Sequence, residues 1–166
     1  TVDSGNFACS LVALRQALHE LKSSRAEAAA ERARKIQEAI DLKPLYNRNR
    51  ALFHIGLDPD TGELSGSYYD LLMSESRMTG YYAIAKRIVP KKHWGALGRT
   101  LTRSGNAIGP VSWTGTMFEY FMPRLFLPAE EGTMEYEALR FCLYCQRRRP
   151  PYGIPWGISE SGFYAF

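Results

Sequence analysis

Residues 4–40 read SGNFACSLVALRQALHELKSSRAEAAAERARKIQEAI, and this stretch decides the fold class. After Ser4-Gly5-Asn6, which is typical of a helix cap, large apolar residues recur at spacings of three and four. These residues are Phe7, Leu11, Leu14, Leu18 and Leu21. Beyond Ser23-Ser24, the segment from Ala26 to Ile40 is rich in Ala, Glu, Arg and Lys, which indicates a second, more solvated helix. We therefore expect a helical hairpin.

A short β-hairpin and a further helix are predicted next. Pro44 stops helical continuation, and the apolar run Leu52 to Leu57 is followed by the turn residues Asp58-Pro59-Asp60-Thr61-Gly62. This pattern predicts a hairpin between Phe53 and Leu64. Ser65 or Ser67 is then expected to cap a helix from about Tyr68 to Arg87, which Pro90 prevents from extending much further.

The second half of the chain is expected to contain two more helices. Glycines, Asn106 and Pro110 predict a loop between Leu101 and Ser112. Thr114 opens the apolar segment Met117 to Leu127, for which Pro123 predicts a buried, kinked helix.

The last well-patterned helix runs from Met134 to about Arg149 and ends at Pro150-Pro151. An aromatic, Gly-rich loop from Tyr152 to Phe166 follows it.

The charge distribution argues against a nucleic-acid partner. The formal net charge is +4, and the basic residues are spread along the chain. Their densest run, Arg147-Arg148-Arg149, falls at the expected end of a helix, where cations favourably meet the helix dipole. No apolar run is long enough to span a bilayer and no signal segment is present, so we expect the segment itself to be soluble.

The cysteines and histidines do not form a metal-site pattern. Cys9 lies far from Cys142 and Cys145, and this pair has no second Cys or His pair at zinc-site spacing. The sequence therefore predicts core thiols in a helix, and no cofactor or metal. His19, His54 and His93 are scattered in unrelated contexts and are interpreted as structural or exposed.

Three glutamates are candidates for acid–base chemistry. Glu75 falls on the apolar stripe of the helix expected after Ser67, where desolvation would raise its pKa toward neutral pH. The alternative for Glu75 is a structural ion pair, with Arg77 or Arg99. Glu119 stands alone among Met117-Phe118 and Tyr120-Phe121-Met122, so it needs a partner.

Glu160 lies in a different setting, the loop Pro155-Trp156-Gly157-Ile158-Ser159-Glu160-Ser161-Gly162. Its glycines allow close approach, and its Trp offers a stacking face, which is typical of a sugar-binding rim. The alternative is a helix cap, in which Glu160 only meets the dipole.

Carboxylates mixed with Trp and Tyr favour saccharide chemistry, because sugars present C–H faces to rings and hydroxyls to carboxylates. Glycoside chemistry needs two carboxylates, one to protonate the leaving oxygen and one to act as nucleophile or base. Asp70 cannot share a helix face with Glu75, because five residues correspond to about 140° of rotation. It could still orient a substrate hydroxyl.

At these residues the sequence resembles a known family. Ser67-Tyr68-Tyr69-Asp70-Leu71-Leu72-Met73-Ser74-Glu75-Ser76-Arg77 resembles a signature of the glucoamylase-like cyclisation domain of cyclic β-1,2-glucan synthases. Further motifs follow in the same order, namely His93-Trp94, Leu101-Thr102-Arg103, Val111 to Tyr120 and Pro155 to Ser161. The resemblance runs from about Ser4 to the C-terminus.

This resemblance, together with the helical patterns, leads us to expect an all-α fold, a partial (α/α)₆ barrel of helical hairpins with a small β-hairpin and long aromatic, Gly-rich loops. The resemblance to this family, which is related to bacterial endo-β-1,2-glucanases, implies that residues 1–166 are a fragment of one such domain, incomplete at both ends. It also implies intramolecular transglycosylation, which closes linear β-1,2-glucan into rings. Glycosyltransferase and phosphorylase-like regions of the same synthase, at the cytoplasmic side of the bacterial inner membrane, are the implied partners.

The resemblance further implies roles for individual residues. Glu160 is expected to be the general acid/base, Glu75 its partner and Glu119 a substitute candidate. The expected substrate contacts are Tyr68, Tyr69, Asp70, Arg77, Trp113 and Trp156. Two other functions stay open, hydrolysis as in an endo-β-1,2-glucanase and saccharide binding without catalysis.

Overall fold

The computed structural model describes residues 1–148, 153 and 155–157. The chain divides into two compact units. Unit 1 contains Thr1–Tyr69 and Met78–Ala96, and unit 2 contains Asp70–Arg77 and the chain from Leu97 onward.

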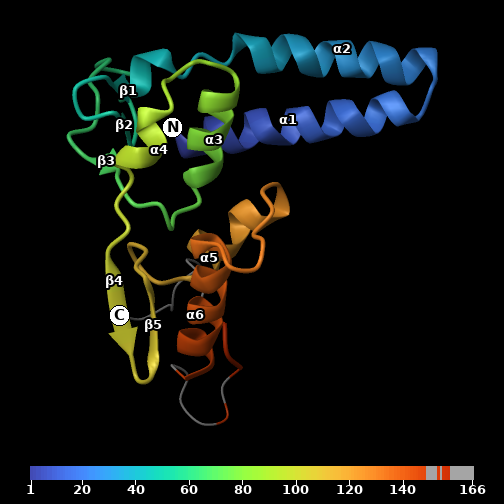
Figure 1. The fold of residues 1–166 in the computed structure, drawn as a ribbon. Coiled ribbons are helices and arrows are strands. Elements are labelled where there is room, and N and C mark those ends of the chain that lie inside the picture. The colour runs from blue at the N-terminus through green and yellow to red at the C-terminus, as the bar shows by residue number, and fades with distance from the viewer. Residues whose placement is uncertain (149–152, 154, 158–166) are drawn as a thin grey trace. The chain divides into compact units, whose positions relative to one another are not determined.

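Unit 1 begins with the helical hairpin that the sequence predicts. Helix α1 (Val2–Glu20) and helix α2 (Ser24–Ala39) lie antiparallel and side by side (Figure 1). The Ser23 side chain caps α2 by accepting a hydrogen bond from the Ala26 backbone N–H at 3.2 Å.

The buried face of the hairpin differs from the predicted leucine stripe. Phe7, Leu14 and Leu21 are about half exposed or more, and Leu11 is the one fully buried member of the stripe. Small residues fill the interior face instead, namely Gly5, Ala8, Ala26, Ala30 and Ala33. Such residues let neighbouring helices approach closely, as at Gly5, where an added Cβ would lie 1.9 Å from Thr79 Oγ1 of helix α3 (Arg77–Ala85).

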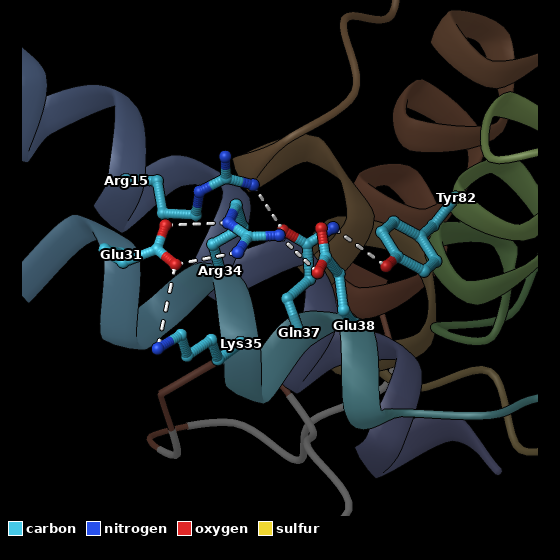
Figure 2. Close-up of polar contacts among 7 residues, drawn as sticks. All are labelled: Arg15, Glu31, Arg34, Lys35, Gln37, Glu38 and Tyr82. Atoms are coloured by element: carbon cyan, nitrogen blue, oxygen red, sulfur yellow. Dashed lines mark hydrogen bonds and ion pairs between the residues drawn. The ribbon is translucent and has the colours of Figure 1, made fainter.

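Two consecutive hydrogen bonds, one partly and one fully buried, tie α1 and α2 to the rest of unit 1. Arg15 Nη1 donates to Gln37 Oε1 at 2.7 Å, and Gln37 Nε2 donates to Tyr82 Oη at 3.0 Å (Figure 2). Gln37 is 2% exposed, so both of its contacts replace water that cannot reach it. On the outer side of α2, Arg34 pairs with Glu31 and Glu38, but exposed pairs of this kind contribute little.

The predicted short strand is part of a three-stranded antiparallel sheet. Its strands are β1 (Tyr46–Asn47), β2 (Leu52–His54) and β3 (Tyr68–Tyr69), in that order, after the 3₁₀ turn η1 (Lys43–Leu45). Phe53 pairs with Tyr69, and a bridge joins Leu57 to Leu64 around the predicted turn. The prediction of a small hairpin in this region is confirmed.

The helix predicted from Tyr68 to Arg87 is much shorter in the structure. Tyr68 and Tyr69 form a strand, and helix α3 spans Arg77–Ala85. The serines serve turns, because the Ser74 hydroxyl accepts from the Ser76 backbone N–H and Ser65 accepts from Ser67. Glu75 therefore does not lie on a helical apolar stripe, and that argument for Glu75 was wrong.

The core of unit 1 lies between α1, the sheet and α3, and its buried members are Ala8, Leu42, Phe53, Tyr82, Ala83 and Val89. His93, on helix α4 (Lys92–Ala96), is 2% exposed and its Nδ1 donates to the Ala51 carbonyl at 2.9 Å. Burial lowers the pKa of this imidazole below its usual value, so His93 is a neutral structural residue.

Unit 2 contains a β-hairpin where the sequence predicted a loop. Strand β4 (Leu101–Ser104) pairs antiparallel with strand β5 (Ala107–Pro110), with Ser104 opposite Ala107. Gly105 has a φ of +56°, which the first position of such a two-residue turn requires. The Gly-Asn pair at 105–106 was thus a hairpin signal and not a loop signal.

The last predicted helix of unit 2 is present, whereas the helix predicted from Met117 to Leu127 is shorter and less buried, with Phe118, Leu125 and Phe126 exposed. Helix α5 (Met117–Phe121) passes into the 3₁₀ turn η2 (Met122–Leu125) at Pro123, and helix α6 spans Met134–Arg148. Strand β5 packs closely on α6, since a Cβ added at Gly109 would lie 2.2 Å from Phe141 Cγ. Cys142 is buried in α6 with its Sγ 3.8 Å from Met117 Sδ, and Cys145 is half-buried.

The fold is therefore mixed, and the prediction of an all-α, partial (α/α)₆ barrel was wrong. Among the described residues, helices are accompanied by a three-stranded and a two-stranded antiparallel sheet. The strands are two to four residues long, which is too short for alternating hydrophobicity to be recognisable in sequence.

Replacing Gln37 with Leu should lower the free energy of unfolding by about 1–3 kcal/mol, because Arg15 and Tyr82 each lose a partner. Urea denaturation followed by circular dichroism measures this change. The control is Glu38→Gln, one residue along on the exposed side of α2, which should change stability little. Equal stability of the Gln37→Leu variant and the unmodified chain would contradict the role of the buried contacts.

Candidate functional site

The candidate residues of unit 2 lie on three segments: the turn region 70–77, the loop before α5, and helix α5 itself. Gly98 fixes the first segment, because its N–H donates to the Asp70 carbonyl at 2.6 Å and its carbonyl accepts from the Leu72 N–H at 3.0 Å. A Cβ at Gly98 would lie 3.2 Å from the Asp70 carbonyl oxygen. Glycine at this position therefore permits the close backbone approach that anchors Asp70.

The structure brings two predicted substrate contacts together. The indole Nε1 of Trp113 donates to Asp70 Oδ1 at 3.1 Å. Trp113 keeps 45% of its surface exposed, so its N–H is used while much of the ring stays open to solvent. This contact between Asp70 and the edge of the indole ring was not predicted, and Asp70 directly follows strand β3 instead of lying on the predicted helix.

Glu119 holds the loop that carries Trp113. We call residues 112–116 the Glu119 loop. Glu119 is 3% exposed, and its carboxylate accepts hydrogen bonds from both backbone and hydroxyl groups of this loop. The donors are Ser112 Oγ (2.9 Å), Trp113 N (2.9 Å), Thr114 N (3.2 Å), Thr114 Oγ1 (2.7 Å), Thr116 N (3.0 Å) and Thr116 Oγ1 (3.1 Å).

The same contacts begin helix α5. Thr116 is the N-cap, and its hydroxyl accepts a hydrogen bond from the Glu119 N–H. The Glu119 carboxylate accepts one from the Thr116 N–H, and this reciprocal pair is a capping box. The Thr-x-x-Glu spacing at 116–119 was a sequence signal for this arrangement, and it was missed. Glu119 found its expected partners among neutral donors, so no cation is needed.

The electrostatics of Glu119 follow from these donors. Burial raises the pKa of the carboxyl, but hydrogen bonds from Thr114, Thr116 and Ser112 outweigh it, and the pKa lies below the ordinary value. Glu119 is therefore ionised at neutral pH and has no proton to donate. This arrangement favours Glu119 as an anchor over Glu119 as an acid.

Other elements of unit 2 support the loop from outside. Gln146 Nε2, on α6, donates to the Gly115 carbonyl at 2.6 Å. Tyr120 Oη donates to the Pro110 carbonyl at 2.6 Å, which ties α5 to β5, and burial raises the pKa of this phenol to about 12. The loop is thus held by α5, α6 and the β-hairpin together.

An open pocket of about 580 Å³ lies beside this loop. It is lined by the hairpin residues Thr102, Arg103, Ser104 and Gly105, by Val111 and the loop residues Ser112 to Gly115, by Tyr120 of α5, and by Phe141, Cys142, Cys145 and Arg148 of α6. Among the described residues, Trp113 is the predicted site residue that lines it. The residues that the β-hairpin and α6 contribute to this pocket were not predicted as site residues, because the sequence did not predict the hairpin that forms the pocket together with α6.

Glu75 lies in a turn, and Arg77 is the first residue of α3. Glu75 is half-buried, and Ser74 Oγ donates to its Oε2 at 3.2 Å. Arg77 is 4% exposed, with Nη1 on Met73 Sδ at 3.1 Å and Nη2 on the Tyr120 carbonyl at 3.5 Å. Burial lowers the pKa of this guanidinium, and the charge of Glu135 opposes that shift. The burial of Arg77 fits a structural role better than an open substrate contact.

The remaining predicted residues are divided between unit 1 and the end of the chain. Tyr68 stacks near His54, with ring centroids 4.4 Å apart, and Asn47 Nδ2 donates to its hydroxyl at 3.0 Å. Tyr69 is 8% exposed. Trp156 is 50% exposed, and Glu160 lies outside the described residues.

The described residues contain no cluster of His, Cys, Asp or Glu that could hold a metal ion. None of the helices in the described part of the chain is both long and apolar enough to cross a membrane.

Sequence comparison relates this chain to a class of synthase. No family model matches it. It is similar to a segment of a cyclic β-1,2-glucan synthase, which confirms the predicted resemblance to this class of enzyme. The relative is the cyclic β-(1,2)-glucan synthase NdvB of Rhizobium meliloti strain 1021, with 40% identity over 154 residues. The match covers 92% of this chain and 5% of the relative, and the assignment to the cyclisation domain stays a prediction.

Replacing Glu119 with Gln should lower the free energy of unfolding at pH 7 by about 1–3 kcal/mol, because a charged acceptor of several hydrogen bonds is lost. The lowered pKa sets the sign of the pH dependence. The stabilisation by Glu119 is complete above the ordinary value of 4.5 and is lost as pH falls through the folded-state value.

Urea unfolding of both proteins at a series of pH values tests this. The difference between them should shrink on acidification below about pH 4.5. Glu131→Gln, at an exposed position of unit 2, is the control and should show little difference at any pH. A pH-independent difference for Glu119→Gln would contradict the assigned anchor role.

Proposed function

We propose that this chain is a glucan-handling segment of an enzyme that makes cyclic β-1,2-glucan. The observation that carries the proposal is the 40% identity to the synthase over almost the whole chain. In the proposed reaction, β-1,2-glucosidic bonds are cleaved and re-formed so that a linear glucan closes into a ring. The inner-membrane location, and cooperation with glycosyltransferase and phosphorylase-like regions of one larger protein, belong to the same proposal.

The geometry around Trp113 supports a saccharide ligand. Its ring is partly open to solvent, and the Glu119 loop and Asp70 fix its two ends. The rigid aromatic face of Trp113 suits the C–H face of a glucose unit, and the second carboxylate oxygen of Asp70 suits a sugar hydroxyl. The adjoining pocket of unit 2 adds the hydroxyl groups of Thr102, Ser104 and Ser112.

Two carboxylates are proposed to carry the chemistry. Glu160 is proposed to donate the proton to the leaving glucosidic oxygen, and Glu75 to act as nucleophile or base. Glu119 is less suited, because its donors lower its pKa and occupy both oxygens. The half-buried position of Glu75 leaves it partly accessible, as a reacting group requires.

Saccharide binding without catalysis is the second candidate function. The hydrogen bonds to the Glu119 carboxylate favour this second function, because they give this acidic residue of unit 2 a structural role and leave it unsuited to catalysis. Incubating the complete parent protein with linear β-1,2-glucan separates the possibilities. Products without reducing ends indicate cyclisation, new reducing ends indicate hydrolysis, and bound but unchanged glucan indicates binding alone.

If the proposed roles are correct, Glu75→Gln and Glu160→Gln in the parent protein should each reduce turnover by about a hundredfold or more, because each removes proton chemistry and keeps shape. Glucan binding should survive in both. Glu63→Gln, in the exposed turn of unit 1, is the control and should keep full turnover. Near-normal turnover in Glu160→Gln would reject the assignment of the acid.

A further inference from the structure

Unit 1 contains a second open pocket, which none of the predicted site residues lines. Its volume is about 560 Å³, within the range of small-ligand sites. Its apolar side is formed by Ile84, Ile88, Val89 and Pro90, at and after the end of α3. Val89 and the flanking isoleucines belong to or pack against the core of unit 1, so this side has a fixed shape.

The other side of the pocket is basic. Arg48, Arg87, Lys91 and Lys92 line it, and no acidic residue does so among the described residues. All four side chains are exposed, and no ion pair joins any of them to a carboxylate in the described part of the chain. These four charges equal the formal net charge of +4 for the whole chain, so the remainder is balanced.

The fold creates this cluster. Arg48 lies in the turn between β1 and β2, about forty positions before the other three, and was not recognisable in sequence as part of a basic group. The prediction that the basic residues are spread holds along the chain but not in space. Four like charges around one concavity repel one another, and a bound anion relieves that repulsion.

The end of α3 accounts for one of these cations at most. Ile88 N–H donates to the Ala83 carbonyl and Arg87 N–H to the Ile84 carbonyl, which is a Schellman ending with Arg87 in the left-handed position. The partial negative charge of a helix end is balanced by a single nearby cation. Arg48, Lys91 and Lys92 lie outside the last turn of α3, so the end of this helix does not account for their clustering.

Arg87 has a φ of +58°, at a position where glycine is usually preferred. Tyr46, which also lines the pocket, has a buried hydroxyl with no hydrogen-bond partner among the described residues. This oxygen has almost no surface open to solvent, so the case for a ligand depends on the basic cluster and the apolar side of the pocket.

We propose that this pocket binds a phosphate group, carried by a ligand with an apolar portion. Each Arg guanidinium can bind two phosphate oxygens at once, and Lys ammonium groups neutralise the remaining charge. The apolar side accommodates the adjoining part of the ligand. A soluble phosphate ester and a phospholipid headgroup share this chemistry.

The test uses the full chain and two probes, inorganic pyrophosphate and vesicles that contain phosphatidylglycerol, with phosphatidylcholine vesicles as the neutral comparison. Saturable binding of pyrophosphate, or of the anionic vesicles over the neutral ones, is expected. The first result identifies a soluble ligand and the second a membrane headgroup. In nuclear magnetic resonance spectra, the backbone signals of residues 87–92 should shift with the bound probe.

Two double variants each remove two positive charges, one pair in the pocket and the other pair away from it. Arg48→Gln combined with Lys92→Gln should weaken binding by about tenfold or more, since two charge-assisted contacts are lost. Arg25→Gln combined with Arg32→Gln, at exposed positions of α2, should leave binding unchanged. Equal weakening by both pairs, or no saturable binding of either probe to the unmodified chain, would overturn the proposal.

Discussion

Unit 2 depends on one buried carboxylate that must be satisfied. Glu119 lies in an apolar helix with 3% of its surface exposed, and leaving its charge without partners would cost several kcal/mol. The chain meets this constraint locally, by wrapping the hydroxyls and backbone N–H groups of residues 112–116 around the two oxygens. Because every donor comes from the adjoining loop, the carboxylate both starts α5 and sets the path of the backbone before it.

The position of Trp113 follows from that path. Its backbone N–H binds Glu119, its indole N–H binds Asp70, and Asp70 is in turn held by Gly98. An aromatic ring that is fixed at both ends and open to solvent loses little conformational entropy when a ligand stacks on it. The structural carboxylate and the proposed saccharide contact are therefore consecutive parts of one network, in which loosening Glu119 would loosen Trp113.

The sequence was sufficient for the long helices and insufficient for the short strands. Helices α1, α2 and α6 have fifteen or more residues, and over such a length helical periodicity indicated each of them, although the predicted cap at Ser4-Gly5-Asn6 was wrong because α1 already begins at Val2. A strand such as Tyr68–Tyr69 is stabilised by pairing with residues distant in sequence. The Tyr-rich and Ser-rich segments near it show no local pattern that predicts a strand. For the same reason Glu75 was assigned to a helix that does not form there, whereas the isolated charge of Glu119 correctly indicated a need for partners. The basic pocket of unit 1 could not be predicted from the sequence, because Arg48 and Lys92 are distant in sequence and line the same pocket only in the folded chain.

The central claim is that the Glu119 loop presents Trp113 to a glucan, and the indole N–H signal of Trp113 in nuclear magnetic resonance spectra tests it most directly. Trp113→Phe assigns this signal among those of the three tryptophans. Adding linear β-1,2-glucan to the full chain should shift the Trp113 signal progressively to saturation, and Glu119→Gln, under conditions where it stays folded, should weaken that response. A Trp113 signal that does not move while glucan binds elsewhere on the chain would contradict the claim.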